Sequence, residues 1–320
     1  MTEKRIVATA PIDQIAIDIL EQVAPFEVAP FPDEETMMGM LEGTIGLVAR
    51  GEGKVTARMI EACPDLAVIG RPGVGYDTVD VDAATARKIP LIYAPIGGFA
   101  VAEGALALLL ALVKMLPLCD ELVRSGQWQK RYENETGDIT DHTVGIIGLG
   151  RIGAHFARLV RPFGVTLLGF DPFVDIQAMR DLGVEMVELD ELLQRSDYVS
   201  LHTPLSDETR GLITRERIAM MKPGAILINT ARGGVIESLD VLAEGLEDGP
   251  LGAVGLDVFP AEPPDVSHRI FKDPRCLFSP HLLGISILAM SRIYKSMATD
   301  MVAVLRGGRP VHCVNPEVFD

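Results

Sequence analysis

The sequence predicts an α/β fold made of two doubly wound parallel sheets, and two observations lead to it. Short apolar runs typical of buried strands alternate with helical stretches along most of the 320 residues. A glycine pattern typical of dinucleotide-binding units stands near the middle of the chain, at Gly148–Gly153. Because this pattern normally follows the first strand of its unit, we expect a separate α/β unit before it.

The expected strands fall into two series. The first comprises Arg5–Ala8, Thr44–Ala49, Leu66–Gly70 and Leu91–Tyr93, and the second Thr143–Ile147, Thr166–Phe170, Tyr198–His202, Ala225–Asn229 and Ala253–Val258. The first unit is expected to end near Pro95, and one long helix, about Val101–Arg124, leads into the second. The helix Ile285–Leu305 and the tail Arg309–Val314 have no strand partner in the second unit, so we expect them to return to the first.

Composition excludes several classes of partner. The net charge is −16 and no basic run occurs, which argues against nucleic acid and against an anionic membrane. The apolar stretch Ala105–Val113 is too short to cross a membrane and is expected in a buried helix or a subunit interface. Four scattered cysteines with no C-x-x-C pair indicate reduced thiols and a cytoplasmic protein, and no histidine or cysteine spacing predicts a metal site.

Gly148, Gly150 and Gly153 form a G-x-G-x-x-G pattern between an expected strand and an expected helix. The first glycine permits a tight turn, the second leaves room for a pyrophosphate against the backbone, and the third lets helix and strand pack closely. Arg151 and Ile152 open the helix, whose free N–H groups and dipole favour phosphate. We therefore expect all five residues to bind a dinucleotide.

Asp171 lies at the tip of the next expected strand and indicates which dinucleotide binds. Its carboxylate can accept hydrogen bonds from a ribose 2′-hydroxyl and would repel a 2′-phosphate. The expected cofactor is therefore NAD.

Polar residues follow the remaining strands of the second unit, where ligands bind in open α/β sheets. They are His202, Thr203 and Pro204 after one strand, Thr230, Ala231 and Arg232 after another, Asp257 and Glu262 after a third, and His281 after a fourth. An arginine fork matches a carboxylate, and a histidine can exchange a proton near neutral pH. A glutamate beside that histidine would orient it. Such a set suits hydride transfer at the carbon of a 2-hydroxy acid.

Each of these residues also has an ordinary structural interpretation. Arg232 could be a solvated loop arginine, Glu262 a surface acid among prolines, and His281 a structural histidine. For His202 we favour a structural or cofactor-wall role, because the proline two residues later fixes the loop.

The motifs taken together resemble the D-isomer-specific 2-hydroxyacid dehydrogenase family over nearly the whole chain. They are Gly73-Val-Gly75-Tyr-Asp77, Ala102-Glu103, Gly148–Gly153, His202-Thr-Pro-Leu205, Asn229-Thr-Ala-Arg232-Gly, Asp257-Val-Phe259 with Glu262-Pro263, and Pro280-His281. The resemblance implies a Rossmann NAD-binding domain, residues 96–286, inserted into a flavodoxin-like substrate-binding domain of residues 1–95 plus 287–320. It also implies a homodimer built around the nucleotide domains.

The same resemblance implies roles for single residues. Arg232 would hold the substrate carboxylate and carbonyl, His281 would be the acid/base beside the cofactor, and Glu262 would stand behind it. Asp257 would bind the nicotinamide amide, and backbone N–H groups near Val74 and Gly75 would hold the substrate carboxylate. Arg50 and Arg71 match arginines that serve phosphate in phosphoglycerate dehydrogenases of this family, but they also occur in members with plain substrates.

The sequence therefore predicts an NAD-dependent dehydrogenase acting on a D-2-hydroxy acid or its 2-keto acid. One alternative is a phosphoglycerate- or phosphoerythronate-type dehydrogenase. Another is a non-catalytic NAD-sensing regulatory protein, because Rossmann scaffolds also serve as regulators. The loop Pro95–Glu103 and the stretch Leu282–Ser286 depart from the usual family pattern, which points to an atypical substrate.

Overall fold

The computed structural model describes residues 4–51 and 53–320, and the chain divides into two compact units. The first unit ends at Gly97 and resumes over Ile285–Asp320, and the second is Gly98–Gly284. We expected the first unit to stop at residue 95 and to resume at residue 287. The function assigned to each unit stays a prediction.

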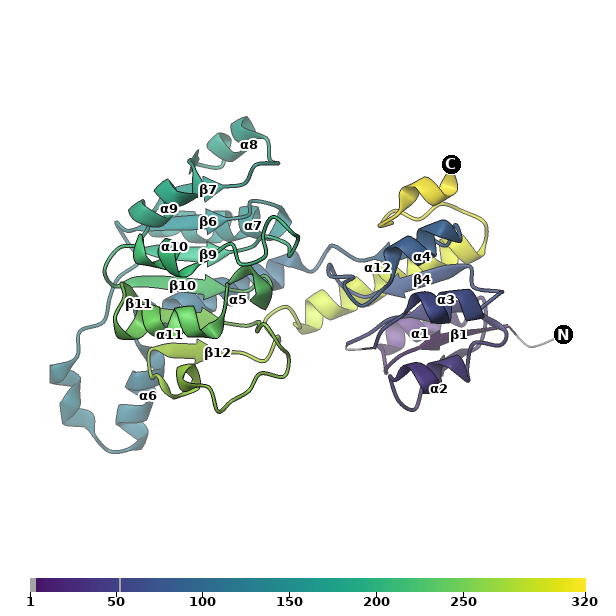
Figure 1. Cartoon of the computed structure of the whole chain (residues 1–320), viewed down its shortest axis with the longest axis horizontal. Coiled ribbons are helices and arrows are strands. Elements are labelled where there is room, and N and C mark those ends of the chain that lie inside the picture. The colour runs from purple at the N-terminus through teal and green to yellow at the C-terminus, as the bar shows by residue number, and fades with distance from the viewer. Residues whose placement is uncertain (1–3, 52) are drawn as a thin grey trace. The chain divides into compact units, whose positions relative to one another are not determined.

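The sheet of the first unit has five parallel strands in the order β2-β1-β3-β4-β5. They are β1 Arg5–Ala8, β2 Phe26–Val28, β3 Thr44–Val48, β4 Val68–Arg71 and β5 Leu91–Tyr93. This is the strand order of flavodoxin-like sheets. Helices α1 Gln14–Leu20, α2 Glu34–Met38, α3 Ala57–Ala62, α4 Val81–Ala86 and α12 Ile287–Leu305 connect or cover the strands (Figure 1).

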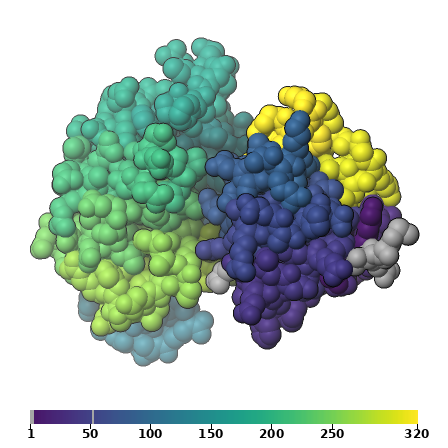
Figure 2. Space-filling model, turned by 45° about the vertical axis from the view of Figure 1, so that its right-hand side comes forward, coloured from purple at the N-terminus to yellow at the C-terminus, as the bar shows by residue number. Residues whose placement is uncertain are grey.

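The C-terminal tail packs on this same unit. Asn315 is buried, and its side chain accepts a hydrogen bond from Leu91 N and donates to Ile89 O. Cys313 forms an antiparallel bridge with Ile92, and η5 Pro316–Phe319 ends the chain. In Figure 2 the yellow tail accordingly lies against the blue residues of the first unit.

The second sheet has seven parallel strands in the order β12-β11-β10-β9-β6-β7-β8. They are β6 Thr143–Ile147, β7 Thr166–Phe170, β8 Val184–Met186, β9 Tyr198–Leu201, β10 Ala225–Asn229, β11 Leu251–Leu256 and β12 Cys276–Phe278. Strand order reverses between β6 and β9, as in Rossmann sheets. The predicted fold class, a Rossmann-like unit inserted into a second parallel-sheet unit, is confirmed.

Helices cover both faces of this sheet and bury two apolar clusters. One cluster joins α9 Leu189–Arg195, α10 Arg215–Ala219 and α11 Leu239–Glu247, with Leu192 and Leu242 fully buried. The other joins α5 Gly98–Val113 and α7 Arg151–Val160, with Phe156 fully buried. The remaining elements are α6 Leu116–Arg124, α8 Ile176–Asp181, η1 Trp128–Glu133, η2 Arg161–Phe163, η3 Gly233–Val235 and η4 Arg269–Lys272.

The prediction of one helix over Val101–Arg124 is wrong, because α5 and α6 meet at a bend of 59°. Pro117 has no N–H to donate to the carbonyl of Val113, and its ring would clash there in a continuous helix. Met115 takes a left-handed conformation with φ 49°, and the Val113 carbonyl accepts from Gly137 N instead.

The sequence predicts no bounds for three strands of three residues each, β2, β8 and β12, although it indicates a strand before His281. All three lie at an edge of their sheet. A run this short gives no readable alternation of apolar and polar residues, so only pairing with a neighbour defines these strands.

No single helix of the described chain is long and apolar enough to cross a membrane, and the bent pair α5–α6 meets that test by length and composition only. Residues 4–51 and 53–320 hold no group of three or more His, Cys, Asp or Glu side chains suited to a metal ion.

Candidate active site

The candidate site lies at the carboxyl edge of the second sheet. Because all seven strands are parallel, the loops that follow β6, β7, β9, β10, β11 and β12 share this edge. The loops after β6 and β9 meet where strand order reverses. A Cβ built on Gly148 would lie 2.7 Å from the carbonyl carbon of His202.

The three glycines of the loop after β6 behave differently. Gly148 has φ 87° and donates its N–H to Phe170 O at 2.9 Å, which makes the tight turn. A Cβ on Gly153 would lie 1.9 Å from Gly148 O, so only glycine allows α7 to approach the loop. A Cβ on Gly150 would meet nothing within 4 Å. The open space over Gly150, at the start of a ten-residue helix, fits a pyrophosphate.

Asp171 follows β7 and is bound to the glycine loop. Its Oδ2 accepts from Leu149 N at 2.8 Å, and its Oδ1 accepts from Phe173 N at 2.9 Å. Each carboxylate oxygen has two lone pairs, so one acceptor site per oxygen is left. The residue can hold the loop in place and still accept a hydrogen bond from a ribose hydroxyl.

His202 follows β9 and is half-buried, with its ring Nδ1 enclosed and without a hydrogen-bond partner among the described residues. Its Nε2 lies 2.9 Å from Ser200 Oγ, and its ring centroid lies 5.1 Å from that of Phe156. Burial lowers the pKa of His202 to about 3, so the ring is neutral near pH 7. A neutral ring fixed under the glycine loop suits a wall of the site better than proton transfer.

Asn229 shapes the loop that carries Arg232, a role that sequence reasoning missed. Its buried Oδ1 accepts from Ala231 N at 3.0 Å, and its Nδ2 donates to Arg232 O at 3.0 Å. A Cβ on Gly233 would lie 1.9 Å from the carbonyl carbon of Phe259, so the loops after β10 and β11 touch. An asparagine at the end of a strand, with Arg-Gly three residues later, is the signal that could have revealed this turn.

Asp257 anchors the turn that carries His281, a second role the sequence did not reveal. Its carbonyl accepts from His281 N at 2.8 Å, and its Oδ1 accepts from Leu282 N at 2.9 Å. Burial raises the pKa of Asp257, and bonds from Ser279 and from the Leu282 and Leu283 N–H groups oppose that effect. The predicted contact of this residue with a nicotinamide amide stays a prediction.

His281 and Glu262 form a close pair at this edge of the sheet. Glu262 Oε2 lies 2.7 Å from His281 Nδ1, and Glu262 Oε1 accepts from Phe259 N at 3.0 Å. Because a carboxylate only accepts, the proton is assigned to Nδ1, which leaves a lone pair on Nε2. The His281 side chain is 49% exposed, so Nε2 is open to a ligand. Its φ of 54° is rare for a residue with a side chain, and such conformations cluster at functional sites.

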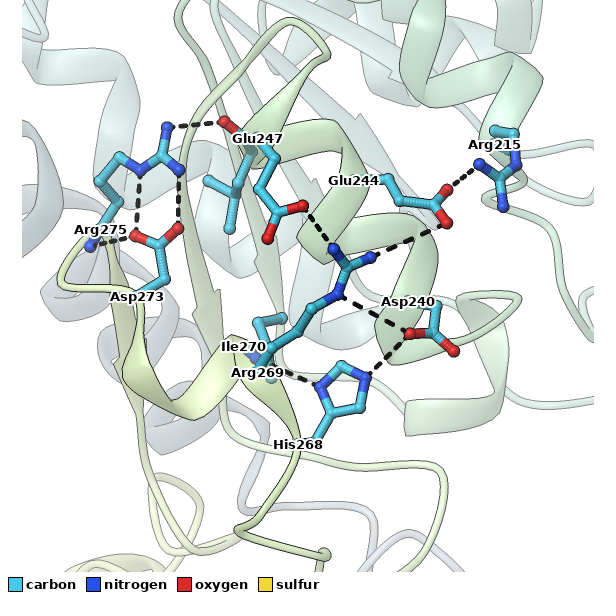
Figure 3. Close-up of polar contacts among 10 residues, drawn as sticks. Arg215, Asp240, Glu244, Glu247, His268, Arg269, Ile270, Asp273 and Arg275 are labelled. Carbon is cyan, nitrogen blue, oxygen red and sulfur yellow. Dashed lines mark hydrogen bonds and ion pairs between the residues drawn. The ribbon is translucent and has the colours of Figure 1, made fainter.

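An ion-pair network fastens the segment between Glu262 and β12 to α11 (Figure 3). The Arg269 guanidinium contacts Asp240, Glu244 and Glu247 of α11, and His268 Nε2 lies 3.1 Å from Asp240 Oδ1. Farther along, Arg275 pairs with Asp273 at 2.7 Å and donates to Leu246 O. Single exposed pairs stabilise little, but several along one segment restrict its movement. The network therefore restrains the segment from His268 to Arg275, which follows Glu262.

The residues present fit a dinucleotide. The open space over Gly150 and the spare acceptor sites of Asp171 suit a pyrophosphate and a ribose. The Thr230 hydroxyl is buried without a hydrogen-bond partner among the described residues, close to Ala231 and Arg232 in the chain. Arg151 and Ile152 open α7, and Thr203 and Pro204 follow His202 at the same edge. All predicted cofactor residues thus lie at one edge of the sheet, in loops or in the first turn of α7.

The other predicted substrate residues belong to the first unit. Arg50 follows β3, and Arg71 is the last residue of β4. Gly73 has φ 113°, and the turn after it carries Val74, whose side chain is 41% exposed, and Gly75. Their predicted contacts with substrate stay predictions.

Comparison with known proteins identifies a family. Residues 106–282 match the model described as D-isomer specific 2-hydroxyacid dehydrogenase, NAD binding domain. The chain is 37% identical over 314 residues to D-3-phosphoglycerate dehydrogenase of Methanocaldococcus jannaschii, covering 97% of this chain and 59% of that protein. It is 35% identical over 297 residues to glyoxylate reductase of Thermofilum pendens, covering 90% of this chain and 86% of that one.

Among solved structures, D-lactate dehydrogenase from Aquifex aeolicus, complexed with NAD and lactic acid, superposes with a TM-score of 0.88. It is 26% identical and covers 98% of this chain and 99% of its own. The chain thus spans little more than half of the phosphoglycerate dehydrogenase that it matches, and nearly all of the lactate dehydrogenase.

The enclosed, neutral ring of His202 predicts a pH dependence of stability. The folded pKa of about 3 lies below the ordinary value of 6.5, so the unfolded chain binds an extra proton between these pH values. The stability is fully present above pH 6.5 and falls as the pH drops toward 3. Between pH 7 and pH 4.5, the wild type should lose roughly 2–3 kcal/mol more unfolding free energy than His202→Gln.

Urea unfolding of both proteins at the two pH values measures this difference. The glutamine amide keeps a polar group near Ser200 but cannot take up the proton. Equal losses in the two proteins would show that His202 is not held neutral by burial.

Proposed function

The chain belongs to the D-isomer specific 2-hydroxyacid dehydrogenase family, and from this premise we propose that it transfers a hydride between a nicotinamide cofactor and C2 of a D-2-hydroxy acid or its 2-keto acid. The observation that carries the proposal is the His281–Glu262 pair, at 2.7 Å, on the sheet edge that holds the glycine loop. A regulator that only sensed NAD would not need an oriented histidine with an open Nε2.

Nicotinamide, when bound, accepts or supplies the hydride. The protein orients the substrate and the cofactor and supplies the electrostatic field around them. In the oxidation direction, His281 Nε2 accepts the proton of the substrate hydroxyl, and Glu262 stabilises the imidazolium through Nδ1–H. In reduction, the imidazolium returns the proton to the carbonyl oxygen. Arg232 holds the carboxylate and stabilises negative charge on that oxygen. Asn229 and Asp257 position Arg232 and His281 through the two turns.

The first unit contributes further substrate contacts in this proposal. Backbone N–H groups near Val74 and Gly75 hold the carboxylate, and Arg50 and Arg71 supply positive charge. The net charge of −16 repels an acidic substrate at long range, so local arginines are required for binding it. This agrees with the family membership and with the relatives named as acting on small acids.

Replacing His281 should stop turnover and spare cofactor binding. We expect His281→Ala to lower kcat by about 10²–10⁴-fold, the usual cost of losing a positioned acid/base. NADH affinity should be retained, because the loop at Gly148–Gly153 and Asp171 is untouched. Turnover of 2-keto acids with NADH and fluorescence titration of NADH give the two readouts.

His142→Ala is the matched control for this experiment. His142 directly precedes β6, at the opposite edge of the sheet, and bonds to Thr140 O at 2.9 Å. Its kcat should stay within about two-fold of the wild type. Full activity of His281→Ala would require another proton donor.

We propose NAD rather than NADP as the cofactor. A 2′-phosphate would meet the Asp171 carboxylate, and the neighbours Pro172 and Phe173 offer no positive charge. The kcat/KM ratio of NADH over NADPH should exceed about ten, because close like charges cost more than 1.4 kcal/mol. Asp171→Asn should lower that ratio while its amide oxygen can still accept from Leu149 N. Equal use of both cofactors by the wild type would contradict the assignment.

We also propose that the protein is a homodimer. Large apolar side chains on α6 and η1 are exposed, namely Leu116, Val123, Trp128 and Tyr132. The two elements project from the second unit in Figure 1. An exposed apolar group of this kind marks an interaction surface. Light scattering should give twice the mass of one chain, and Val123→Asp should lower it, whereas a single-chain mass for the wild type would rule the dimer out.

A further inference from the structure

Three rings of the first unit form a row that leads from the C-terminal tail to the loop after β4. The ring centroid of Tyr76 lies 6.2 Å from that of Tyr93, with the ring planes at 90°. The Tyr93 centroid lies 6.4 Å from that of the His312 ring, with the planes at 84°. Aromatic rings at such separations attract one another edge to face, so both contacts in this aromatic row are favourable.

Asp300 of α12 holds the outer end of the aromatic row. This residue is 4% exposed, and its Oδ1 accepts from Val311 N at 3.0 Å. Its Oδ2 accepts from His312 N at 3.1 Å and lies 3.0 Å from His312 Nδ1. Because a carboxylate only accepts, the Nδ1 proton is assigned to this contact. A buried carboxylate requires such donors, so Asp300 fixes both the backbone and the ring of His312.

The inner end of the aromatic row is the loop after β4. Tyr93 is the last residue of β5, and the next residue, Ala94, donates its N–H to Gly73 O at 2.9 Å. Tyr76 lies three residues beyond Gly73, and its carbonyl accepts from Val79 N at 3.0 Å. The end of β5 is therefore joined to this loop twice, by a backbone hydrogen bond at Gly73 and by the ring contact at Tyr76.

The two joined points enclose Val74 and Gly75, whose N–H groups hold the substrate carboxylate in the proposed function. Val74 is 41% exposed and Tyr76 is 39% exposed, so the rest of the unit covers this loop only in part. Groups that bind a substrate must be held to within about 0.5 Å by their supporting contacts. For an exposed loop of this kind, the ring contact of Tyr76 with Tyr93 is a supporting contact.

We propose that Tyr93 and His312 are positioning residues, which act through Tyr76 to hold Val74 and Gly75 where the loop binds the substrate carboxylate. This inference rests on the proposed function and adds to it two residues that act through the loop rather than on the substrate. Without the middle or the outer ring, the loop moves more and binds the carboxylate less well. The second unit, with its glycine loop and its acid/base pair, is unchanged.

Two variants of Tyr93 test this role, because Tyr93→Ala removes the middle ring and Tyr93→Phe keeps it. Reduction of glyoxylate and of hydroxypyruvate by NADH is measured for both variants. Tyr93→Ala should raise KM for both acids about three- to ten-fold and leave kcat within about two-fold, since it weakens binding of substrate and transition state alike. Tyr93→Phe should match the wild type. A fall in kcat with KM unchanged would show a merely structural role and overturn the proposal.

His312→Ala removes the outer ring and should raise KM in the same direction, by about two- to three-fold. Phe31→Ala is the matched control for the loss of a ring. Phe31 is 66% exposed and follows β2, which lies at the opposite end of the sheet from β5. This control should leave both KM and kcat unchanged. A rise of KM in Phe31→Ala equal to that in Tyr93→Ala would mean that any lost ring disturbs the unit, and the proposal would fail.

Amide hydrogen exchange of the full chain, without substrate or cofactor, separates this inference from the proposed function. Exchange in the peptide covering residues 73–79 should become about three- to ten-fold faster in Tyr93→Ala and stay unchanged in Tyr93→Phe. If no 2-keto acid is reduced but Tyr93→Ala exchanges faster, the proposed function fails and the hold on the loop stands. If 2-keto acids are reduced and KM does not respond to Tyr93→Ala, the function stands and the positioning role is refuted, whatever the exchange rate.

Discussion

Parallel pairing of every strand in the second sheet is the constraint on which the candidate site depends. Parallel strands need crossover connections, and these bring all carboxyl ends to one edge. Residues as far apart in the chain as Gly148 and His281 therefore lie in loops at one edge. In open α/β sheets the point where strand order reverses, here between β6 and β9, is where ligands bind. The first sheet obeys the same rule, and its edge collects Arg50 and Arg71.

Buried polar side chains then fix the loops at that edge. Asn229 and Asp257 satisfy backbone N–H groups of the very turns that carry Arg232 and His281. Because an unpaired buried N–H is costly, the turns have few alternatives. The turns that carry Arg232 and His281 are therefore held by polar side chains at the ends of β10 and β11. The ion pairs on α11 extend the same restraint to the segment that follows Glu262.

The protein carries a net negative charge, so binding an acidic ligand requires positive groups close to it. A net charge of −16 disfavours acids at a distance, so the chain concentrates guanidinium groups and backbone N–H groups where an acid would bind. Two histidines at the same edge of the sheet differ in their surroundings and therefore in what they can do. The ring of His202 has an enclosed Nδ1 and is neutral, whereas His281 is half-exposed beside a carboxylate. One can serve as a wall of the site and the other can exchange a proton.

The sequence by itself determined the fold class, the glycine loop, and strands such as Thr143–Ile147 and Ala225–Asn229 to the residue, because these are local patterns of apolar spacing and turn chemistry. It also named Arg232, Glu262 and His281, which carry their chemistry in their type and in their place after a strand. Tertiary structure alone decided the rest. The Val113 carbonyl that Pro117 leaves free finds its donor in Gly137 N, the edge strands exist only through pairing, and the 2.7 Å contact of Glu262 with His281 joins residues from two loops. The contacts of Asn229 and Asp257 depend on burial, and burial belongs to the packed chain, not to any segment of it.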